Sequence, residues 1–526
     1  MGYTSFISSR DIYYIRYGDI CMTNILQMLE NSAEKYPDKK AFIDPTGFIT
    51  FSELMDHSKK VGSFLAQHTI PGQAVAYYLE KSTLAMCGLM GAIYAGCHYV
   101  VVDLRQPETR IRSIESTLSS SVILTDMINL ERAQTIFSAP VYTIESILDS
   151  TKVDEKRLSF IRERSLDIDP LYVNFTSGST GTPKGVTVSH RSVIDFIPIF
   201  TEIFRITSDD ILGNQAPFDF DVSVKDIYSG LCTGATVLII PRSYFSNPTQ
   251  LMDYLCDNNV TVLIWAVSAM CFVSIMNGFQ YRNPSTLRTV LFSGEVMPVK
   301  QLNILKTYQP GVQFVNLYGP TEITCNCTYH FLEDRLYEKE ERIPIGRTFP
   351  NEKVFLLDEN NQEITVPNTP GELCVSGTCL ALGYYSNPEK TKEVFTQNPL
   401  NTRWQESIYR TGDLCSYTEA GDLVYLSRKD FQIKHMGHRI ELGEIESASE
   451  SCEGISRACC LYDSRKKKLL LFYVGDTDKE TLLESLRSSL PAFMIPNKVF
   501  PLEFMPMTKN GKIDRSSLKE IGGIKD

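Results

Sequence analysis

The sequence predicts an α/β fold with a large core of βαβ units, a small barrel-like β subdomain and a small α+β unit at the C-terminal end. The first observation is the alternation of strand and helix patterns up to about residue 342, which indicates largely parallel sheets. The second is a series of short strands with Gly and Pro punctuation after that point. The third is a compact strand and helix pattern after Lys429, which at roughly 100 residues is long enough for a domain of its own.

Size and composition describe a globular chain and exclude several classes of protein. The 526 residues correspond to three to four units at about 150 residues per domain, although larger α/β units would lower that number. Hydrophobic residues make up 43% and charged residues 22%, which argues against a disordered chain, collagen or a disulfide miniprotein. The net charge is −11, and an acidic chain without a basic tract is a poor candidate for a general nucleic-acid binder.

The absence of targeting signals and the cysteine pattern favour a cytoplasmic protein. Residues 1–20 lack the apolar run of a signal peptide, and no stretch reaches 18 apolar residues, so we expect no membrane association. The 14 cysteines are scattered and form no secreted framework, which fits a reducing cytosol. The spacing in Cys325-Asn326-Cys327 is wrong for a zinc site. We expect a monomer.

The elements of the core follow one another in strand and helix alternation. Residues 22–70 predict a helix, short strands and a second helix, and Pro71-Gly72 forms a turn before the next strand. A helix over Ser82–Ala95 ends near Gly96. The further expected elements are Ala74–Leu79, Tyr99–Val102, Val122–Leu124, Leu171–Phe175, Ser192–Phe200, Thr236–Ile240, Pro248–Asn258, Val260–Trp265, Thr289–Phe292, Lys300–Thr307 and Gln313–Leu317.

The C-terminal third predicts antiparallel or barrel-like packing followed by the α+β unit, with the boundary at Ser427–Phe431. Short strands are expected at Lys353–Leu357, Glu372–Ser376 and Asp422–Leu426. Beyond the boundary we expect a helix over Arg439–Glu450, strands over Ile455–Asp463 and Lys468–Gly475, and a helix over Asp478–Leu490.

The most informative segment joins the apolar strand Leu171–Phe175 to a loop that is rich in glycine and hydroxyl groups. Glycines allow backbone N–H groups to converge on an anion, the hydroxyls donate further hydrogen bonds, and Lys184 neutralises charge. The pattern predicts a polyphosphate cradle, but not a Walker A loop, because Pro183-Lys184-Gly185 replaces Gly-Lys-Ser/Thr. The residues expected to bind the nucleotide here are Thr176, Ser177, Gly178, Ser179, Thr180, Gly181 and Lys184.

This loop resembles that of the adenylate-forming superfamily, which includes acyl-CoA synthetases, firefly-type luciferases and the adenylation domains of nonribosomal peptide synthesis. Further segments resemble the family's motifs in the same order across nearly the whole chain. The resemblance implies an N-terminal core over 1–428, with the β subdomain at about 342–428, and a mobile C-terminal lid over 429–526. It also implies ATP and Mg²⁺ as cofactors.

Two more segments resemble the family's nucleotide motifs. In Asn316–Glu322 the resemblance implies that Tyr318 stacks on adenine, Thr321 contacts the α-phosphate and Glu322 holds Mg²⁺. Tyr409–Leu414 resembles the ribose motif. These segments and the strand ends beside them add further residues to the predicted nucleotide site. They are Ser293, Gly294, Glu295, Asn316, Tyr318, Gly319, Thr321, Glu322, Asp413 and Arg428.

The lid segments resemble the family's hinge and its last motif. Asp430 would be the pivot, and Lys434 and Gly437 belong to the segment that approaches the thiol acceptor in relatives. We interpret the histidines that flank Gly437 as structural or surface groups. Lys512 would reach the substrate carboxylate and the α-phosphate, a task that suits a mobile point charge, and would act together with Thr321, Glu322 and Lys184.

One segment favours an amino acid as the acid that is activated. Phe220–Asp226 resembles the substrate motif of amino-acid activators, in which the aspartate, here Asp221, pairs with the α-ammonium group. Lys225 in this pocket needs a polar or anionic partner, because burying it unpaired costs roughly several kcal/mol, and this favours a small polar or acidic side chain. The pocket carried over from the motif is Asp221, Val222, Lys225, Ile264, Leu291, Ser293, Leu317, Cys325, Asn326 and Lys512.

The sequence thus predicts an AMP-forming amino acid–[carrier protein] ligase. A carboxylate would attack the α-phosphorus of ATP, and the phosphopantetheine thiol of a separate carrier protein would then take the aminoacyl group. Only eleven residues follow Arg515, so we expect a freestanding enzyme or an excised domain. Two alternatives stay open: a D-alanine–carrier-protein ligase, since Ser223–Tyr228 and Ser293–Pro298 are similar to that group, and an acyl- or aryl-CoA ligase, against which Asp221 argues.

Overall fold

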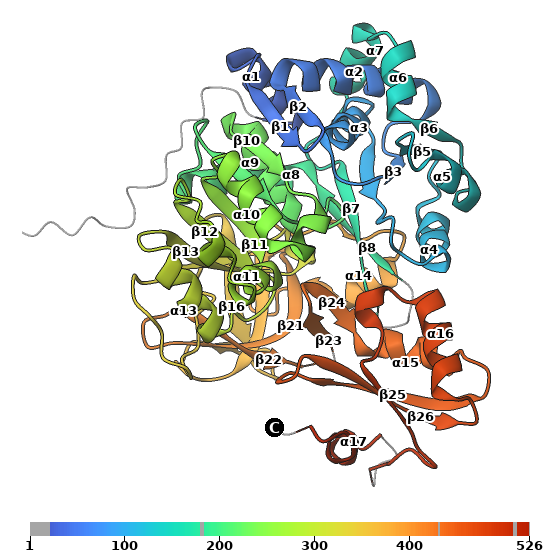
Figure 1. Ribbon diagram of the computed structural model, residues 1–526, viewed down its shortest axis with the longest axis vertical. Helices are drawn as coiled ribbons and strands as arrows, with labels where there is room; N and C mark the ends of the chain where they lie inside the picture. Colours follow the sequence, from blue (N-terminus) through green and yellow to red (C-terminus); the bar gives the residue numbers. More distant parts are fainter. Residues whose placement is uncertain (1–21, 179–182, 430–431, 509–512, 525–526) are drawn as a thin grey trace, which may run out of the picture.

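The computed structural model describes residues 22–178, 183–429, 432–508 and 513–524, and confirms the α/β fold (Figure 1). The strands described before residue 429 form three sheets. One has the order β19-β8-β7-β4-β3-β5-β6, in which β8 pairs antiparallel with both β7 and β19 and the pairs from β7 to β6 are parallel. Its strands are β3 (Ala74–Tyr78), β4 (His98–Val101), β5 (Val122–Thr125), β6 (Val141–Thr143), β7 (Pro170–Thr176), β8 (Lys184–Ser189) and β19 (Gly383–Tyr384).

The second sheet has the order β15-β14-β13-β12-β11-β9-β10-β1-β2 and is parallel from β13 to β1. The expected alternation of largely parallel sheets with helices is therefore confirmed. The strands are β1 (Lys40–Asp44), β2 (Gly47–Thr50), β9 (Ile211–Asn214), β10 (Thr236–Ile239), β11 (Val262–Ala266), β12 (Thr289–Ser293), β13 (Gln313–Tyr318), β14 (Thr328–Phe331) and β15 (Arg347–Thr348).

Helices fill the space between these two sheets and cover their outer faces. A single apolar cluster joins α2, α3, α8 and α9 to strands of both sheets, so these helices form a shared central layer. The helices before residue 310 are α1 (Leu26–Lys35), α2 (Phe51–His68), α3 (Thr83–Tyr94), α4 (Glu108–Leu118), α5 (Leu130–Ile136), α6 (Ile144–Ser150), α7 (Glu155–Arg162), α8 (His190–Ile203), α9 (Val222–Thr233), α10 (Pro248–Asp257), α11 (Val267–Ile275), α12 (Gly278–Tyr281) and α13 (Val299–Tyr308).

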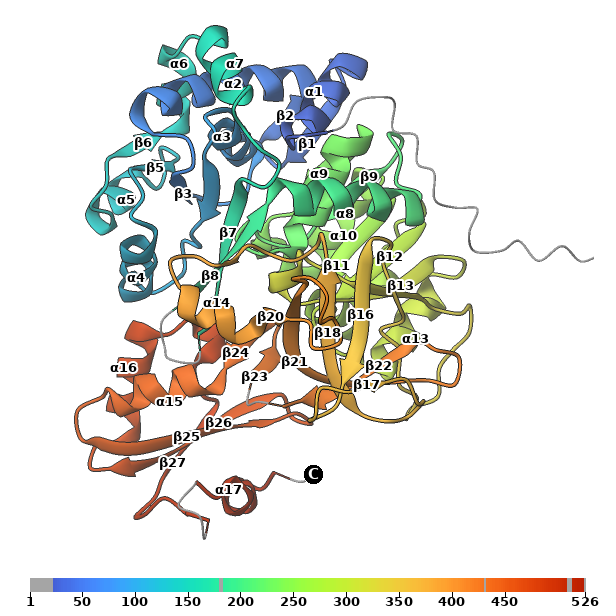
Figure 2. The same cartoon turned by 180° about the vertical axis from the view of Figure 1, so that it is seen from behind.

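The third sheet is antiparallel throughout, as the Gly and Pro punctuation after residue 342 predicts (Figure 2). It packs its own small apolar core around Leu356, Leu373 and Tyr409. Its strands are β16 (Glu352–Leu357), β17 (Glu363–Ile364), β18 (Gly371–Gly377), β20 (Phe395–Gln397), β21 (Ser407–Tyr417) and β22 (Leu423–Arg428), and α14 (Pro388–Val394) lies between β19 and β20.

The remaining residues form the α+β unit, which we call the lid. Its elements are the hairpin β23 (Gln432–His435) and β24 (His438–Glu441), α15 (Leu442–Glu450), the strands β25 (Ile455–Asp463), β26 (Lys468–Gly475) and β27 (Lys498–Pro501), α16 (Lys479–Ser489) and α17 (Arg515–Gly522). The expected helix over Arg439–Glu450 is wrong at its start, because Arg439–Glu441 belong to β24. Met436 and Gly437 both have positive φ, which closes a tight hairpin turn there.

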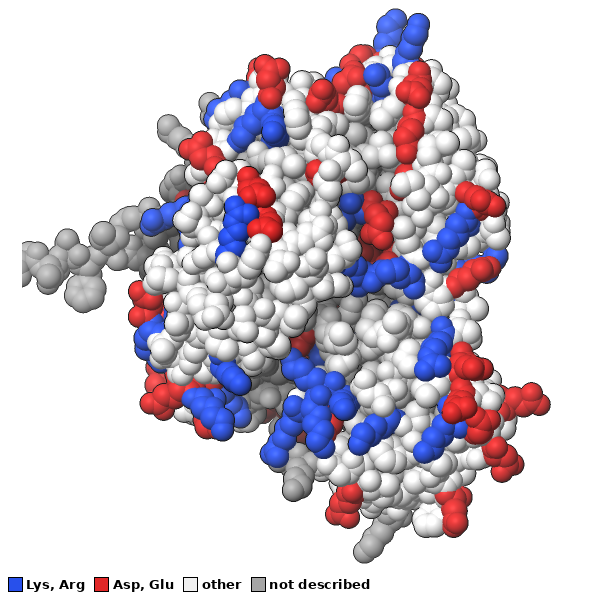
Figure 3. Space-filling model, in the orientation of Figure 1, with Lys and Arg blue, Asp and Glu red and all other residues white. Residues whose placement is uncertain are grey.

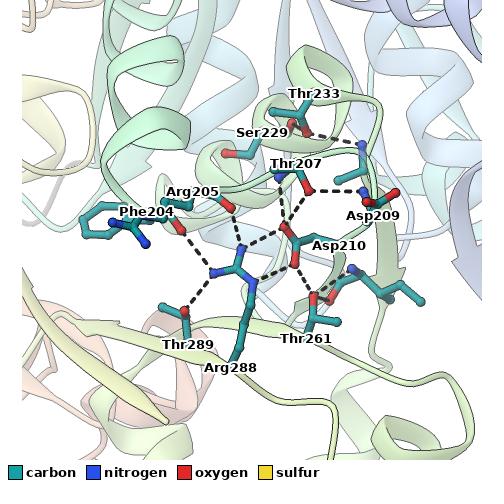
Figure 4. Close-up of polar contacts among 12 residues, drawn as sticks. Phe204, Arg205, Thr207, Asp209, Asp210, Ser229, Thr233, Thr261, Arg288 and Thr289 are labelled. Carbon is teal, nitrogen blue, oxygen red and sulfur yellow. Dashed lines mark hydrogen bonds and ion pairs between the residues drawn. The ribbon is translucent and has the colours of Figure 1, made fainter. Parts of the chain in front are cut away.

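A polar cluster around the buried carboxylate of Asp210 joins the strand ends of the second sheet opposite the cavity described below (Figure 4). Arg288, just before β12, donates from Nε and Nη2 to the two oxygens of Asp210 at 2.9 and 2.8 Å. The same guanidinium donates to the carbonyls of Phe204 and Arg205 at the end of α8, and Thr261 donates to Asp210 at 2.7 Å. Charge-assisted bonds of this kind tie α8, β9, β11 and β12 together.

Candidate active site

A cavity lies where the carboxyl ends of β7, β11, β12 and β13 meet the lid hairpin. The carboxyl edge of parallel strands is where α/β sheets ordinarily bind ligands. Core residues that line the cavity include Asn174, Thr176, Ser177, Asp219, Phe220, Asp221, Val222, Ala266, Ser293, Gly294, Gly319, Thr321, Cys325, Asp413 and Arg428. The lid contributes Gln432, Lys434, Gly437, His438, Arg439 and Phe493.

The predicted phosphate loop begins at this cavity. Thr176, at the end of β7, and Ser177 line it, whereas Ser179, Thr180 and Gly181 lie outside the described residues. The hydroxyl of Ser177 donates to the backbone carbonyl of Arg439 at 2.7 Å, so the lid strand β24 lies directly against the loop. Lys184 Nζ lies 3.8 Å from Glu322 Oε1 and 3.7 Å from Glu441 Oε1. The loop lysine and the predicted metal ligand therefore share one site.

Glu322 is the most strongly held carboxylate in the site. Its side chain is fully buried; Oε1 accepts from Tyr384 at 2.8 Å, and Arg439 Nη1 donates to Oε1 and Oε2 at 2.9 and 2.7 Å. Burial alone would raise the pKa of this carboxyl, but the charges of Arg439 and Lys184 outweigh it and lower the pKa to about 2. Glu322 is therefore an anion that requires a positive partner.

A single carboxylate beside a phosphate loop fits Mg²⁺, which typically takes one or two carboxylates and completes its shell with phosphate oxygens and water. The described residues hold no cluster of three or more His, Cys, Asp or Glu side chains that could bind a metal alone. Glu322 would hold the ion, and Arg439 now donates to both of its oxygens. The site therefore fits Mg²⁺ once Arg439 has withdrawn.

Three of the ribose and adenine residues predicted from the sequence meet where the ends of β13 and β22 lie against the middle of β21. Arg428 and Asp413 form an ion pair at 2.6 Å and both line the cavity. The hydroxyl of Tyr318 also donates to Asp413, and Lys434 Nζ lies 5.5 Å from the centre of the Tyr318 ring. Asn316 points elsewhere, since its amide donates to the carbonyl of Pro344 at 2.7 Å.

The predicted substrate pocket divides into two groups of residues. Asp221, Val222, Ser293 and Cys325 line the cavity. Asp221 precedes α9 but makes no capping hydrogen bond, so its carboxylate is left to the cavity rather than used to start the helix. Burial raises the pKa of Asp221, and this effect is only partly offset by a hydrogen bond with Thr321 and by the charge of Lys225, both of which lower the pKa. A cation in the cavity would restore its charge.

The second group lies behind that surface and does not line the cavity. It consists of Lys225, Ile264, Leu291, Leu317 and Asn326, all of which are buried. Lys225 Nζ donates to Asn326 Oδ1 at 2.5 Å, which supplies the polar partner that the sequence analysis required. Burial lowers the pKa of Lys225, and the groups that oppose this include Asp221 and Asp226. In this structure the lysine has a partner within the protein.

The lid is fixed to the core by contacts on both sides of the hairpin. The Gly437 N–H donates to Glu295 Oε1 at 2.6 Å, and a Cβ added at Gly437 would lie 2.9 Å from Ser268 Oγ, so only glycine allows this approach. His438 stacks on Phe493 with ring centres 3.7 Å apart and meets the edge of Phe220. His435 contacts the Tyr462 hydroxyl at 3.3 Å.

Helix α17 lies on the other face of the lid sheet. Lys512 and the hinge residue Asp430 lie outside the described residues. Helix α17, which follows, packs Leu518 against Leu470 and Phe472 of β26, whereas α15 packs against Leu469, Leu471 and Tyr473. Because successive side chains of a strand point to opposite faces, the two helices cover opposite faces of the lid sheet. The hairpin that precedes α15 is the part of the lid that enters the cavity.

Three features of the site were missed by the sequence analysis. Arg439 directly follows His438, and neither Arg439 nor Tyr384 was among the residues predicted for the site. Arg110 of α4 forms a buried ion pair with Glu444 of α15. An arginine two positions after Gly437 could have been noticed, but the Arg110–Glu444 pair joins residues 334 positions apart and no local pattern reveals it.

Comparisons with known proteins place this geometry in a family. The family model described as AMP-binding enzyme matches residues 29–385. The chain belongs to the AMP-binding enzymes. Zwittermicin A synthase ZmaJ of Bacillus cereus is 33% identical over 514 residues, which cover 96% of each chain. The L-proline–[L-prolyl-carrier protein] ligase of Streptomyces coelicolor is 30% identical and covers 93% of this chain and 95% of its own.

The relatives of this AMP-binding enzyme also include parts of long synthetases. The chain is 30% identical to tyrocidine synthase 3 of Brevibacillus parabrevis but spans only 8% of that protein. Among solved structures, holo-PA1221, a nonribosomal peptide synthetase protein containing adenylation and PCP domains, superimposes with a TM-score of 0.82 at 25% identity over 95% of this chain and 84% of its own. The chain is thus an adenylate-forming adenylation domain of the nonribosomal type, as the motif order predicts.

Proposed function

We propose that the protein activates an α-amino acid as its adenylate and transfers the aminoacyl group to the thiol of a phosphopantetheinylated carrier protein. The observation that carries this proposal is the position of Asp221, which lines the cavity and whose side chain makes no hydrogen bond that caps α9. Since burial disfavours the charged form of this carboxyl, a substrate with an ammonium group would stabilise it. The similarity to an L-proline–[L-prolyl-carrier protein] ligase supports the acceptor.

In the first step the substrate carboxylate attacks the α-phosphorus of ATP, and the bond between the α-phosphorus and the bridging oxygen breaks to release pyrophosphate. Thr176, Ser177 and Lys184 would bind the departing phosphates, and Asp413 the ribose. Bound Mg²⁺, held by Glu322, would offset phosphate charge. No general base is required, because the carboxylate is already ionised at neutral pH. Positioning and electrostatics therefore provide the catalysis.

In the second step the carrier thiol gives its proton to solvent and its sulfur attacks the adenylate carbonyl. The carbonyl bond to the phosphate oxygen breaks and AMP leaves. The arrangement described above, with Gly437 and His438 against the core, supports this step, because β24 then contacts Ser177, which ATP would need. We propose the domain boundary at residues 428 and 429, Asp430 as the hinge, and Lys512 as the group that acts in the first step.

Pyrophosphate exchange tests the proposed substrate class. We expect exchange with one or a few amino acids and none with the matching acids that lack the α-amino group. D221A removes the anion, and we expect it to lower kcat/KM for the amino acid by about 10²-fold or more, as for a buried ion pair that loses one partner. Exchange that responds equally to acids without an amino group would overturn the assignment.

Asp219 offers a matched control within the same loop. It also lines the cavity, but burial and then the charge of Asp103 raise the pKa of its carboxyl to about 7. An amide at this position removes less charge near neutral pH, so D219N is expected to retain most of the exchange activity. Loss of exchange in D219N but not in D221A would move the ammonium site to the neighbouring carboxylate.

A further inference from the structure

Lys81 is a lysine whose ammonium group is turned into the protein. Figure 3 shows Lys and Arg side chains spread over one face of the molecule, several of them beside acids, which is the ordinary place for such charges. Lys81 follows β3, and its Nζ donates to the side-chain oxygen and the carbonyl of Asn214 at 2.9 and 3.1 Å. It also donates to the carbonyls of Gln215 and Ala216 at 2.8 and 3.3 Å. One ammonium group thus holds three consecutive residues, whose acceptors share its three protons.

These contacts lie at the start of the connection from β9 to α9, residues 215–221, which we call the β9–α9 loop. The loop forms one wall of the cavity, through Pro217, Asp219, Phe220 and Asp221. Within the part of the chain that the structure describes, no backbone N–H donates to the carbonyls of Gln215 and Ala216. Lys81 therefore satisfies two acceptors of this loop that the backbone leaves open.

Asn214 carries the contact from Lys81 on to α9. Its Nδ2 donates to Asp226 Oδ2 at 2.8 Å, and both side chains are fully buried. Asp226 lies on α9, five residues after Asp221. Burial lowers the pKa of Lys81, and among the charges that oppose this effect that of Asp226 is the largest. Lys81 thus holds the β9–α9 loop at its start through carbonyls and at its end through Asn214 and α9.

The segment that carries Lys81 is itself held at a second point. The Thr83 N–H donates at 2.8 Å to Oδ2 of Asp44, which ends β1 in the same sheet as β9. Burying an ammonium group costs free energy, and an apolar side chain in its place often leaves a fold as stable or makes it more stable. What the charge of Lys81 provides here is a fixed place for the loop that it contacts.

We propose that Lys81 is a positioning residue of the substrate site, which holds the β9–α9 loop so that Asp221 meets the ammonium group of the amino acid. This inference rests on the proposed function, since it concerns the binding of that substrate. Lys81 is not among the described residues that line the cavity, so it acts through the loop. The groups proposed for the triphosphate and the ribose lie on β7, β8 and β21. Loss of Lys81 should therefore weaken the binding of the amino acid and not that of ATP.

Pyrophosphate exchange with the amino acid that the wild type prefers tests this role in K81M, which keeps an unbranched side chain and removes every donor. We expect KM for the amino acid to rise about tenfold or more, as for the loss of hydrogen bonds from a charged group. KM for ATP and kcat should stay within about twofold, because residues remote from a change are little affected. K81R restores a charged donor, and we expect it to recover most of the lost affinity.

D226N tests the same chain of contacts and leaves Lys81 in place. The new amide oxygen still accepts from Asn214, so only the charge is lost, and we expect KM for the amino acid to rise about threefold. K81M/D226N should be no worse than K81M, because the two changes act through one set of contacts.

K156M is the matched control, since it makes the same substitution at an exposed lysine of α7 and should change neither KM. A folded K81M with the KM of the wild type for the amino acid would overturn the inference alone; if K81M does not fold, an unchanged KM in D226N would do so. An equal rise in KM for ATP, or a loss that K81R does not reduce, would also overturn it. A wild type that exchanges equally with acids lacking the amino group would overturn the proposed function instead.

Discussion

At the scale of single residues, Glu322 decides what the site can do at any moment. It is buried and ionised, and a buried anion requires a counter-charge. Arg439 supplies that charge here through bonds to both oxygens, and Mg²⁺ would need the same oxygens. If Glu322 holds Mg²⁺ as proposed, the two cations exclude each other, and the chemistry that needs the metal and the arrangement that docks β24 belong to different states of the enzyme.

Replacing Arg439 should therefore separate the two half-reactions. In R439M the docked lid leaves Glu322 with Lys184 at 3.8 Å and the Tyr384 hydroxyl. Losing one partner of a buried pair costs about 3 kcal/mol, and we expect thioester formation to fall roughly 100-fold. Pyrophosphate exchange should stay within about threefold, because Arg439 must leave before ATP binds. R457M, which removes an exposed arginine of the lid, should affect neither rate.

Much of this site could be predicted from the sequence, because its parts lie in short contiguous motifs. The phosphate loop and Glu322 each follow a strand, and parallel strands bring their carboxyl ends together, whereas Asp413 lies within the antiparallel strand β21 and was found through its motif. The position of a lid cannot be predicted in this way. Arg439 meets Glu322, and Arg110 meets Glu444, only through the relative placement of two units that are far apart in the chain.

At the scale of elements, the hairpin β23–β24 is where the structure differs from the sequence prediction. Arg439–Glu450 was expected to be one helix, but its first residues pair antiparallel with β23, and Lys434 lies opposite Arg439. The decisive feature is the turn, where Met436 and Gly437 adopt φ of +53° and +82°. Two central residues with positive φ match the right-handed twist of a short hairpin, and Gly is the residue that favours it. The turn at Met436 and Gly437 therefore fixes Arg439–Glu441 as a strand, although the residues after them form the helix α15.

The Arg288–Asp210 cluster gives a stability prediction for the elements that it joins. Burial would raise the pKa of Asp210, but bonds from Arg288, Thr207 and Thr261 outweigh it and lower the pKa below its usual value. A carboxyl whose pKa is lower in the folded protein stabilises the fold at pH values above its pKa in the unfolded chain, about 3.9. This stabilisation is lost as the pH falls through the pKa of the folded state. We expect D210N to lower the free energy of unfolding by about 2 kcal/mol at pH 7.

Denaturant titrations of wild type and D210N from pH 7 downwards provide the measurement. The difference between the two proteins should shrink below about pH 4, because protonation removes the same charge from the wild type. D209N, which changes the neighbouring carboxylate outside the Arg288 bonds, should change stability by less than about 0.5 kcal/mol. A difference that stays constant over the whole pH range would mean that the carboxylate charge is not what holds these elements.

At the scale of the whole molecule, the lid closes the phosphate loop from outside. Ser177 bonds to Arg439, Glu441 lies 3.7 Å from Lys184, and Thr109 of α4 donates to the carbonyl of Ser488 in α16 at 3.0 Å. The first two of these contacts occupy Ser177 and Lys184, which are proposed to bind the triphosphate. Binding of ATP and docking of the lid in this orientation should therefore oppose each other, and by linkage each weakens the other to the same degree.

A reversible cross-link tests this opposition. In T109C/S488C the two cysteines should form a disulfide in the nucleotide-free enzyme, because the native side chain and carbonyl are in hydrogen-bond contact. A non-hydrolysable ATP analogue with Mg²⁺ should slow its formation, since ligand that binds one state draws the population toward it. The cross-linked enzyme should lose pyrophosphate exchange and regain it on reduction, whereas each single variant should stay active throughout. Exchange that continues unchanged in the oxidised double variant would mean that the lid and ATP do not compete for the loop.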